Sequence, residues 1–198
     1  MEGLRRGNPR HLSEKFMRIL AFAASNSSTS INRQLVDYAA QIAAETQADV
    51  EIETLDIHDY EMPLYQSDRE AADGIPQRAH DFLARIGEAD VLIISFAEHN
   101  GAYTAAFKNL FDWCSRVGRE VWQGKPMLLL ATSPGGRGGQ SVLEFASSAA
   151  PRFGGDVVAS LAVPSFHENF DMSAGRLSDA ELDKALRSKI AQLLDQPC

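Results

Sequence analysis

Residues 18–32 read RILAFAASNSSTSIN, and the rest of the chain is organised around this stretch. An apolar run ends abruptly in small hydroxyl and amide residues, and a helical pattern of apolar residues begins at once. This order predicts a parallel strand over residues 18–23, a tight polar loop, and a helix that begins near Ile31. At such a junction the backbone N–H groups and the helix dipole favour an anion, most often a phosphate.

The polar loop also offers side chains that can donate hydrogen bonds to such an anion. They are Ser25, Ser27, Ser28, Thr29, Ser30 and Asn32. We interpret the loop as the site that holds the phosphate of a nucleotide-type cofactor. The alternative is that Ser30 acts only as the N-cap of the helix, and the stretch alone leaves that alternative open.

Strands and helices alternate along the whole chain. We expect strands at residues 18–23, 50–55, 91–96, 126–132 and 157–163, each followed by a helical pattern. The alternating pattern of residues 50–55 is typical of an edge strand, and the unbroken apolar run of residues 91–96 is typical of a central one. The sequence therefore predicts an α/β fold, a doubly wound five-stranded parallel sheet in the order 2-1-3-4-5 with helices on both faces.

Two more unusual loops follow the third and fourth strands, at residues 97–103 and 133–139. In the order 2-1-3-4-5 they converge with the first loop beyond the carboxyl ends of the strands, where ligands bind such sheets. In the second loop, Asn100 and Gly101 can present backbone N–H groups to the edge of a ring, or they form an ordinary turn. In the third loop, the glycines let the backbone lie close to a flat ligand, or they make a flexible connection.

The sequence lacks several motifs that would indicate other chemistry. It has no GxGxxG and no GxxxxGK[ST], which disfavours a Rossmann dinucleotide site and a P-loop, whereas a ring of hydroxyls suits the terminal monophosphate of FMN. It has no GxSxG, and its histidines and cysteines show no metal-ligand spacing. We therefore expect no metal and no catalytic side chain, with the reactivity supplied by a cofactor.

Bulk properties narrow the functional class further. The chain has 198 residues, 44% of them hydrophobic, and a net charge of −8, which disfavours nucleic acids and anionic membranes as partners. We expect a single domain over residues 17–198 and a disordered or loosely ordered extension over residues 1–16, without a signal peptide or membrane span. With only two cysteines, one of them Cys114 on an apolar helix face, a reducing compartment such as the cytoplasm fits best.

The first loop resembles the phosphate loop GSxRxxSxN of the NAD(P)H-dependent FMN reductases, a family that includes flavin, quinone, azo-dye and chromate reductases. Ser25, Ser30 and Asn32 match this pattern, whereas Ala24 replaces its glycine and Ser27 replaces its arginine. The loss of that charge-assisted contact should weaken the binding of a phosphate or of NADPH.

The second loop and the helix after it resemble another motif of the same family, PEYNGSxPxxLKNxxDW. His99 stands in place of the tyrosine beside the flavin, and Thr104 stands in place of the proline. The third loop looks like the glycine-rich flavin-edge loop of the family. The residues that match the second motif in register are Glu98, Asn100, Gly101, Lys108, Asn109, Asp112 and Trp113.

The resemblance implies a flavodoxin-like fold with FMN as cofactor and NADPH or NADH as electron donor. NAD(P)H would deliver hydride to flavin N5 and leave, and a second small molecule would then be reduced in the same place, which is a ping-pong mechanism. Family members usually form homodimers or homotetramers. The expected cofactor-binding residues are Ser25, Ser27, Ser30, Ile31, Asn32, Ala97, Glu98, His99, Asn100, Gly101, Ser133, Pro134, Gly135 and Gly136.

Two other functions remain open at this stage. One is a flavodoxin-like electron carrier that does not oxidise NAD(P)H itself. The other is a flavin-free doubly wound hydrolase or transferase, in which Glu98 would be the acid/base candidate. The sequence does not identify the electron acceptor, the preferred nucleotide, whether FMN stays bound, or the role of residues 166–170.

Overall fold

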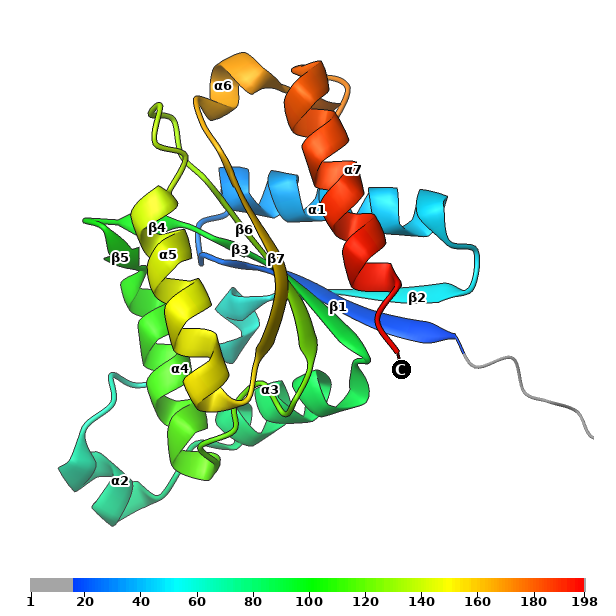
Figure 1. Cartoon of the computed structure of the whole chain (residues 1–198). Coiled ribbons are helices and arrows are strands. Elements are labelled where there is room, and N and C mark those ends of the chain that lie inside the picture. Colours follow the sequence, from blue (N-terminus) through cyan, green and yellow to red (C-terminus); the bar gives the residue numbers. More distant parts are fainter. Residues whose placement is uncertain (1–15, 198) are drawn as a thin grey trace, which may run out of the picture.

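The computed structural model describes residues 16–197, so residues 1–15 of the expected extension lie outside the described part. Its central sheet consists of five parallel strands in the order β2-β1-β3-β6-β7, which confirms the predicted order (Figure 1). The strands are β1 (Met17–Ala24), β2 (Val50–Asp56), β3 (Val91–Phe96), β6 (Pro126–Thr132) and β7 (Asp156–Val163).

Burial along the strands follows the sequence pattern. Every residue of β3 is buried, as the unbroken apolar run predicts, whereas β2 is buried only at Leu55 and forms one edge of the sheet. A central strand is covered by helices on both faces, so all of its side chains enter a core.

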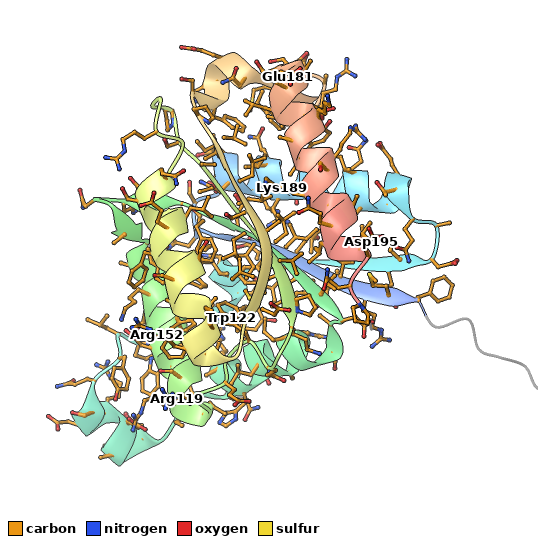
Figure 2. All side chains as sticks on the ribbon, viewed as in Figure 1. Arg119, Trp122, Arg152, Glu181, Lys189 and Asp195 are labelled. Atoms are coloured by element: carbon orange, nitrogen blue, oxygen red, sulfur yellow. The ribbon has the colours of Figure 1, made fainter. Side chains whose placement is uncertain are left out.

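The helices cover both faces of the sheet, as Figure 1 shows. On one face, α1 (Ile31–Thr46) and α7 (Ala180–Leu194) enclose a core with the inward residues of β1, β3 and β6. On the other face, α3 (Gln77–Glu88), α4 (Ala105–Val117) and α5 (Gln140–Ala149) enclose the second core. Side chains fill the space between the sheet and both helical layers (Figure 2). None of the helices within residues 16–197 is long and apolar enough to cross a membrane.

Several short elements were not predicted, because elements of two to seven residues carry too little periodicity to be recognised. Two of them lie in the polar connection after β2, and a hairpin occupies the second unusual loop. The unpredicted elements are η1 (Ile57–Tyr60), α2 (Ser67–Asp73), β4 (Glu98–His99), β5 (Ala102–Tyr103), η2 (Ala150–Phe153), α6 (Phe166–Asn169), β8 (Phe170–Asp171) and β9 (Arg176–Leu177).

Polar residues of α4 hold the connection that follows β2. The side-chain amide of Asn109 donates to the carbonyls of Met62 and Pro63 at 3.0 and 3.2 Å, and its oxygen accepts from the backbone N–H of Tyr65 at 2.8 Å. The indole N–H of Trp113 donates to the carbonyl of Pro63 at 2.8 Å. These two motif residues therefore hold the connection after β2 against α4 by hydrogen bonds to its backbone.

The segment after β7 supports the third unusual loop. The backbone N–H groups of Ser165 and Phe166 donate to the carbonyls of Gly135 and Ser133, at 3.0 and 3.1 Å. Phe166 and Phe170 are buried and stack on each other with ring centroids 4.6 Å apart. This segment, which the sequence did not place, is thus a brace between the α1–α7 core and the glycine-rich loop.

Candidate functional site

The first loop joins β1 to α1 and retains hydroxyl groups at the helix N-terminus. Ser30 is the N-cap of α1, and its Oγ accepts from the backbone N–H of Arg33 at 3.2 Å. Ser27 Oγ accepts from the backbone N–H of Thr29 and lies near Thr29 Oγ1, both at 3.4 Å. Hydrogen bonds this long are weak and can be exchanged for bonds to a ligand. The cap therefore exists, and the hydroxyls of Ser25, Ser27 and Thr29 make only hydrogen bonds of 3.3 to 3.4 Å within the loop.

The side chain of Asn32 is hydrogen-bonded inside the protein at the start of α1. Its side chain is only 2% exposed, and Oδ1 accepts from Ser95 Oγ at 2.8 Å and from the backbone N–H of Thr132 at 3.0 Å. Its Nδ2 donates to the carbonyl of Thr132 at 3.1 Å. The side chain thus ties α1 to the ends of β3 and β6, so its polar atoms already have partners inside the protein.

The second loop is a tight hairpin formed by β4 and β5. Its two turn residues, Asn100 and Gly101, both have positive φ, 53° and 77°. Asn-Gly is the preferred dipeptide for such a two-residue turn, so this pair forms an ordinary turn, and its predicted contact with a cofactor ring stays a prediction. The first strand of the hairpin and the residue before it line a cavity that they share with the first loop. The lining residues from this segment are Ala97, Glu98 and His99.

Glu98 and Thr104 connect the hairpin region to other elements. Glu98 Oε2 accepts from the backbone N–H of Val142 in α5 at 2.9 Å. Thr104 Oγ1 caps α4 by accepting from the backbone N–H of Phe107 at 3.2 Å, and it donates to the carbonyl of Ala24 at 3.1 Å. Thr104 therefore links the start of α4 to the end of β1.

The glycines of the third loop fall into two groups. A Cβ on Gly138 would lie 2.7 Å from the carbonyl carbon of Val163, so close backbone packing requires that glycine. A Cβ on Gly136 would meet no atom within 4 Å, and one on Gly135 would meet only Ser133 Oγ at 4.0 Å. The structure explains Gly138 by packing, whereas Gly135 and Gly136 lie beside open space that a ligand can use.

The three loops line one shallow, open cavity of about 210 Å³ at the carboxyl ends of β1, β3 and β6. Most of the predicted site residues line it, together with Thr29 and Thr132, and Asn100, Gly101, Gly135 and Gly136 do not. Thr132, which we did not predict as a site residue, could have been found as the last residue of its strand. The cavity is lined by Ser25, Ser27, Thr29, Ser30, Ile31, Asn32, Ala97, Glu98, His99, Thr132, Ser133 and Pro134.

No lysine or arginine is among the described residues that line this cavity. Arg33 lines an adjoining cavity of about 250 Å³, and its guanidinium pairs with Asp37 at 3.1 Å and with Asp56 at 3.5 Å. Since Ser27 stands where the family pattern has arginine, this loop offers an anion hydrogen-bond donors and the dipole of α1 but no cation from the described lining residues.

Cys114 lies in the core away from this cavity. It is fully buried, and burial raises the pKa of its thiol to about 12. A thiol with such a pKa is not a nucleophile at neutral pH. Within residues 16–197, no group of three or more His, Cys, Asp or Glu side chains is arranged to hold a metal ion.

Comparison with known proteins assigns the family. Residues 17–168 match the family of NADPH-dependent FMN reductases. The chain belongs to this family. The match covers all three loops of the cavity, which agrees with the resemblance of their sequences.

Two characterised relatives match part of this chain. It is 32% identical over 125 residues to an NADPH:quinone oxidoreductase of Arabidopsis thaliana, covering 63% of this chain and 62% of that one. It is 33% identical over 123 residues to a 2-hydroxy-1,4-benzoquinone reductase of a Burkholderia species, covering 62% and 63%. The matched segments thus span less than two thirds of these relatives.

A solved structure supports the fold over nearly the whole chain. The flavoenzyme NAD(P)H:(acceptor) oxidoreductase FerB from Paracoccus denitrificans superposes with a TM-score of 0.70 at 23% identity, covering 90% of this chain and 96% of that one. The flavodoxin-like fold expected of this family is confirmed.

Proposed function

We propose that this member of the NADPH-dependent FMN reductase family binds FMN in the three-loop cavity and passes electrons from NAD(P)H to a small-molecule acceptor. One observation carries the proposal. The hydroxyl-rich N-terminus of α1 lies beside the hairpin region and the glycine-rich loop at the carboxyl end of the sheet. A terminal phosphate suits the first loop, and a flat ring suits the space beside the other two.

The residues present fit FMN at both ends of the molecule. At the phosphate end, Ser25, Ser27 and Thr29 offer hydroxyl groups next to the N-terminus of α1. At the ring end, the open space beside Gly135 and Gly136 leaves room for a planar group to approach the backbone. The fit rests on hydrogen bonds and shape, because no cation lies in the part of the cavity that the structure describes.

FMN, when bound, supplies the redox chemistry by accepting two electrons from NAD(P)H and giving them to an acceptor. The protein binds the phosphate with the first loop and orients the ring between the hairpin and the glycine-rich loop. No described side chain is needed as an acid or base, and one oxygen of Glu98 is already engaged by the backbone of α5.

Quinones are the acceptor class that we propose. Two relatives are named as reductases of quinones, and a quinone is a flat molecule that fits the same space as the nicotinamide. Free flavins and azo compounds are the competing acceptors. Steady-state rates with a simple benzoquinone, free FMN and an azo dye, each with NADH and with NADPH, would rank them by kcat/KM.

The visible spectrum of the purified protein is the first test of the cofactor. We expect flavin absorbance to remain after incubation with FMN and desalting, or FMN fluorescence to be quenched on titration with protein. Loss of all flavin on desalting, together with no quenching at micromolar protein, would refute the proposal that FMN binds here.

Initial-rate kinetics test the order of the two half-reactions. A series of NAD(P)H concentrations at fixed quinone concentrations should give parallel double-reciprocal lines, because one substrate leaves before the next enters. Intersecting lines would refute the ping-pong mechanism. A protein that binds FMN but does not oxidise NADH or NADPH would instead be an electron carrier.

We also propose a homodimer or homotetramer, because the family usually assembles in this way. Phe145 of α5 is 50% exposed and packs edge-on against Tyr103 of the hairpin, which supports a contact near the site. Sedimentation velocity with and without FMN would measure the mass, and a monomer under both conditions would refute this proposal.

A further inference from the structure

Helix α5 begins without the side-chain cap that helices normally carry. Its N-cap residue is Gly139, which has a φ of 77° and no side chain to accept a hydrogen bond. The backbone N–H groups of a first helical turn need acceptors from outside the helix. The backbone N–H of Gln140 donates to the nearby carbonyl of Arg137 at 3.0 Å, and the N–H of Val142 needs another acceptor.

Glu98 supplies that acceptor from the neighbouring loop. Its Oε2 lies 2.9 Å from the backbone nitrogen of Val142, in the first turn of α5 and 44 residues further along the chain. A carboxylate at this position faces the positive end of the helix dipole, which strengthens the bond. Because Glu98 opens β4, the bond joins the hairpin to the helix that follows the glycine-rich loop.

Two more contacts meet at the start of α5. The guanidinium of Arg137, in the glycine-rich loop, donates to Ser141 Oγ at 2.8 Å. The ring of Tyr103, at the end of the hairpin, packs edge-on against Phe145 with centroids 5.0 Å apart. The first turns of α5 are therefore the place where the hairpin and the glycine-rich loop are fastened to each other.

We propose that Glu98 is a positioning residue that caps α5 from the hairpin and so sets the spacing between the two loops that flank the flavin ring. This inference rests on the proposed binding of FMN. A side chain that only contacted the flavin would not need to reach Val142, and a side chain that only stabilised α5 would not affect the fit of the ring. Glu98 would stabilise α5 and also affect the fit of the ring, because the helix that it caps carries the glycine-rich loop at its start.

Three variants test whether Glu98 acts by capping α5 or only through its charge. Glu98→Gln keeps a carbonyl oxygen that can accept from Val142, and Glu98→Met keeps the length of the side chain but has no acceptor. Glu144→Met is the matched control, because Glu144 is exposed on the same helix and accepts only from the side chain of Gln140 among the bonds described. Far-UV circular dichroism would verify that each variant is folded.

Amide hydrogen exchange of Val142 in the FMN-free protein tests the cap directly. We expect the fastest exchange of this amide in Glu98→Met, a smaller increase in Glu98→Gln, whose neutral oxygen accepts a weaker bond, and wild-type exchange in Glu144→Met. Fluorescence titration then tests the spacing. The FMN dissociation constant should rise about tenfold in Glu98→Met, the loss expected for one charge-assisted hydrogen bond, with an altered visible circular dichroism of the bound flavin. The dissociation constant should rise less in Glu98→Gln than in Glu98→Met, and it should stay within about twofold of wild type in Glu144→Met.

Either readout can overturn the inference. Unchanged Val142 exchange in Glu98→Met would show that Glu98 does not cap α5. Faster exchange with unchanged FMN affinity and flavin dichroism would show a cap that does not position the ring. Equal loss of affinity in Glu98→Gln and Glu98→Met would assign the effect to charge instead. If the wild-type protein does not bind FMN, the proposed function itself fails, while Val142 exchange still reports on the cap.

Discussion

The side-chain amide of Asn32 is buried where α1 meets β3 and β6, and both its oxygen and its nitrogen are hydrogen-bonded there. Asn32→Ala would leave polar groups of Ser95 and Thr132 without partners. We expect the free energy of unfolding to fall by about 2–4 kcal/mol, because buried unpaired groups keep their full desolvation cost.

Urea denaturation of the FMN-free protein would measure this loss. Asn26→Ala is the control, since Asn26 is an exposed asparagine in the loop that precedes α1, and its effect should stay within about 0.5 kcal/mol. A loss below about 1 kcal/mol for Asn32→Ala would contradict the structural role that we assign to this amide.

Ser27 is the residue at which this chain departs most clearly from the phosphate-loop pattern of its family. Ser27→Arg would place a cation beside the proposed phosphate, in a cavity where the described lining residues include no lysine or arginine. We expect the FMN dissociation constant to fall about tenfold at low salt, and less at high salt, because the new contact is charge-assisted and exposed.

A titration at two salt concentrations would test this expectation. Ser28→Arg is the matched control, because Ser28 lines the adjoining cavity of Arg33 rather than the three-loop cavity. Equal effects of the two variants would mean that only the overall charge of the loop matters.

At the level of elements, two glycines of the glycine-rich loop differ in their surroundings. Gly138 is closely packed against a neighbouring strand, whereas Gly136 lies beside open space. Gly138→Ala would force a Cβ against the backbone of Val163 at a φ of 59°. We expect a loss of about 2–3 kcal/mol of stability, because neither the strand nor the positive φ can relax cheaply.

Gly136→Ala is the matched comparison in the same loop. A Cβ there meets nothing within 4 Å, so stability should change by less than about 1 kcal/mol, whereas FMN affinity should fall if the ring lies against this backbone. Thermal melts of both variants would measure the change in stability, and FMN titrations would measure the change in affinity. Similar melting temperatures for the two would contradict the packing argument.

Helix α4 and the connection after β2 also act as one unit. Trp113→Phe keeps an aromatic ring in the core and removes the N–H that donates to Pro63. We expect a loss of more than about 1 kcal/mol, because the smaller ring also leaves a cavity, and faster proteolysis within residues 57–66, because the loop loses one of its anchors. Trp122→Phe is the control, because Trp122 is also buried but makes no described hydrogen bond to this loop. This variant should not change the cleavage of residues 57–66.

For the whole molecule, Cys114 can report how FMN binding stabilises the fold. Its thiol is buried and its pKa is raised to about 12 by burial, so alkylation should require global opening. In a Cys198→Ser background, FMN at 100 times its dissociation constant should slow alkylation about 100-fold, because binding stabilises only the folded state. Rapid alkylation that FMN does not slow would contradict this expectation.

The five main strands and the helices between them could be read from the sequence, because hydrophobic periodicity reports which faces are buried. The run at residues 91–96 and the alternation at residues 50–55 even indicated which strand is central and which is at an edge. The position of the cavity followed from the same pattern, since three polar loops after adjacent strands must meet at one end of a parallel sheet.

The short elements and the roles of single polar residues could not be read in this way. Asn32, Glu98 and Asn109 belong to motifs that suggested a ligand, yet the structure pairs each of them with a backbone group far along the chain. A side chain that accepts from a residue 44 or 100 positions away leaves no local signal in the sequence.

The sequence by itself thus determined the layered α/β fold, the strand order and the loops that form the cavity, because burial and chain connectivity leave a pattern along the chain. Only the tertiary structure decided which polar groups face the cavity and which are used inside the protein. The physical reason is that a buried hydrogen-bonding group must find a partner in space, and folding alone determines which distant residue supplies it.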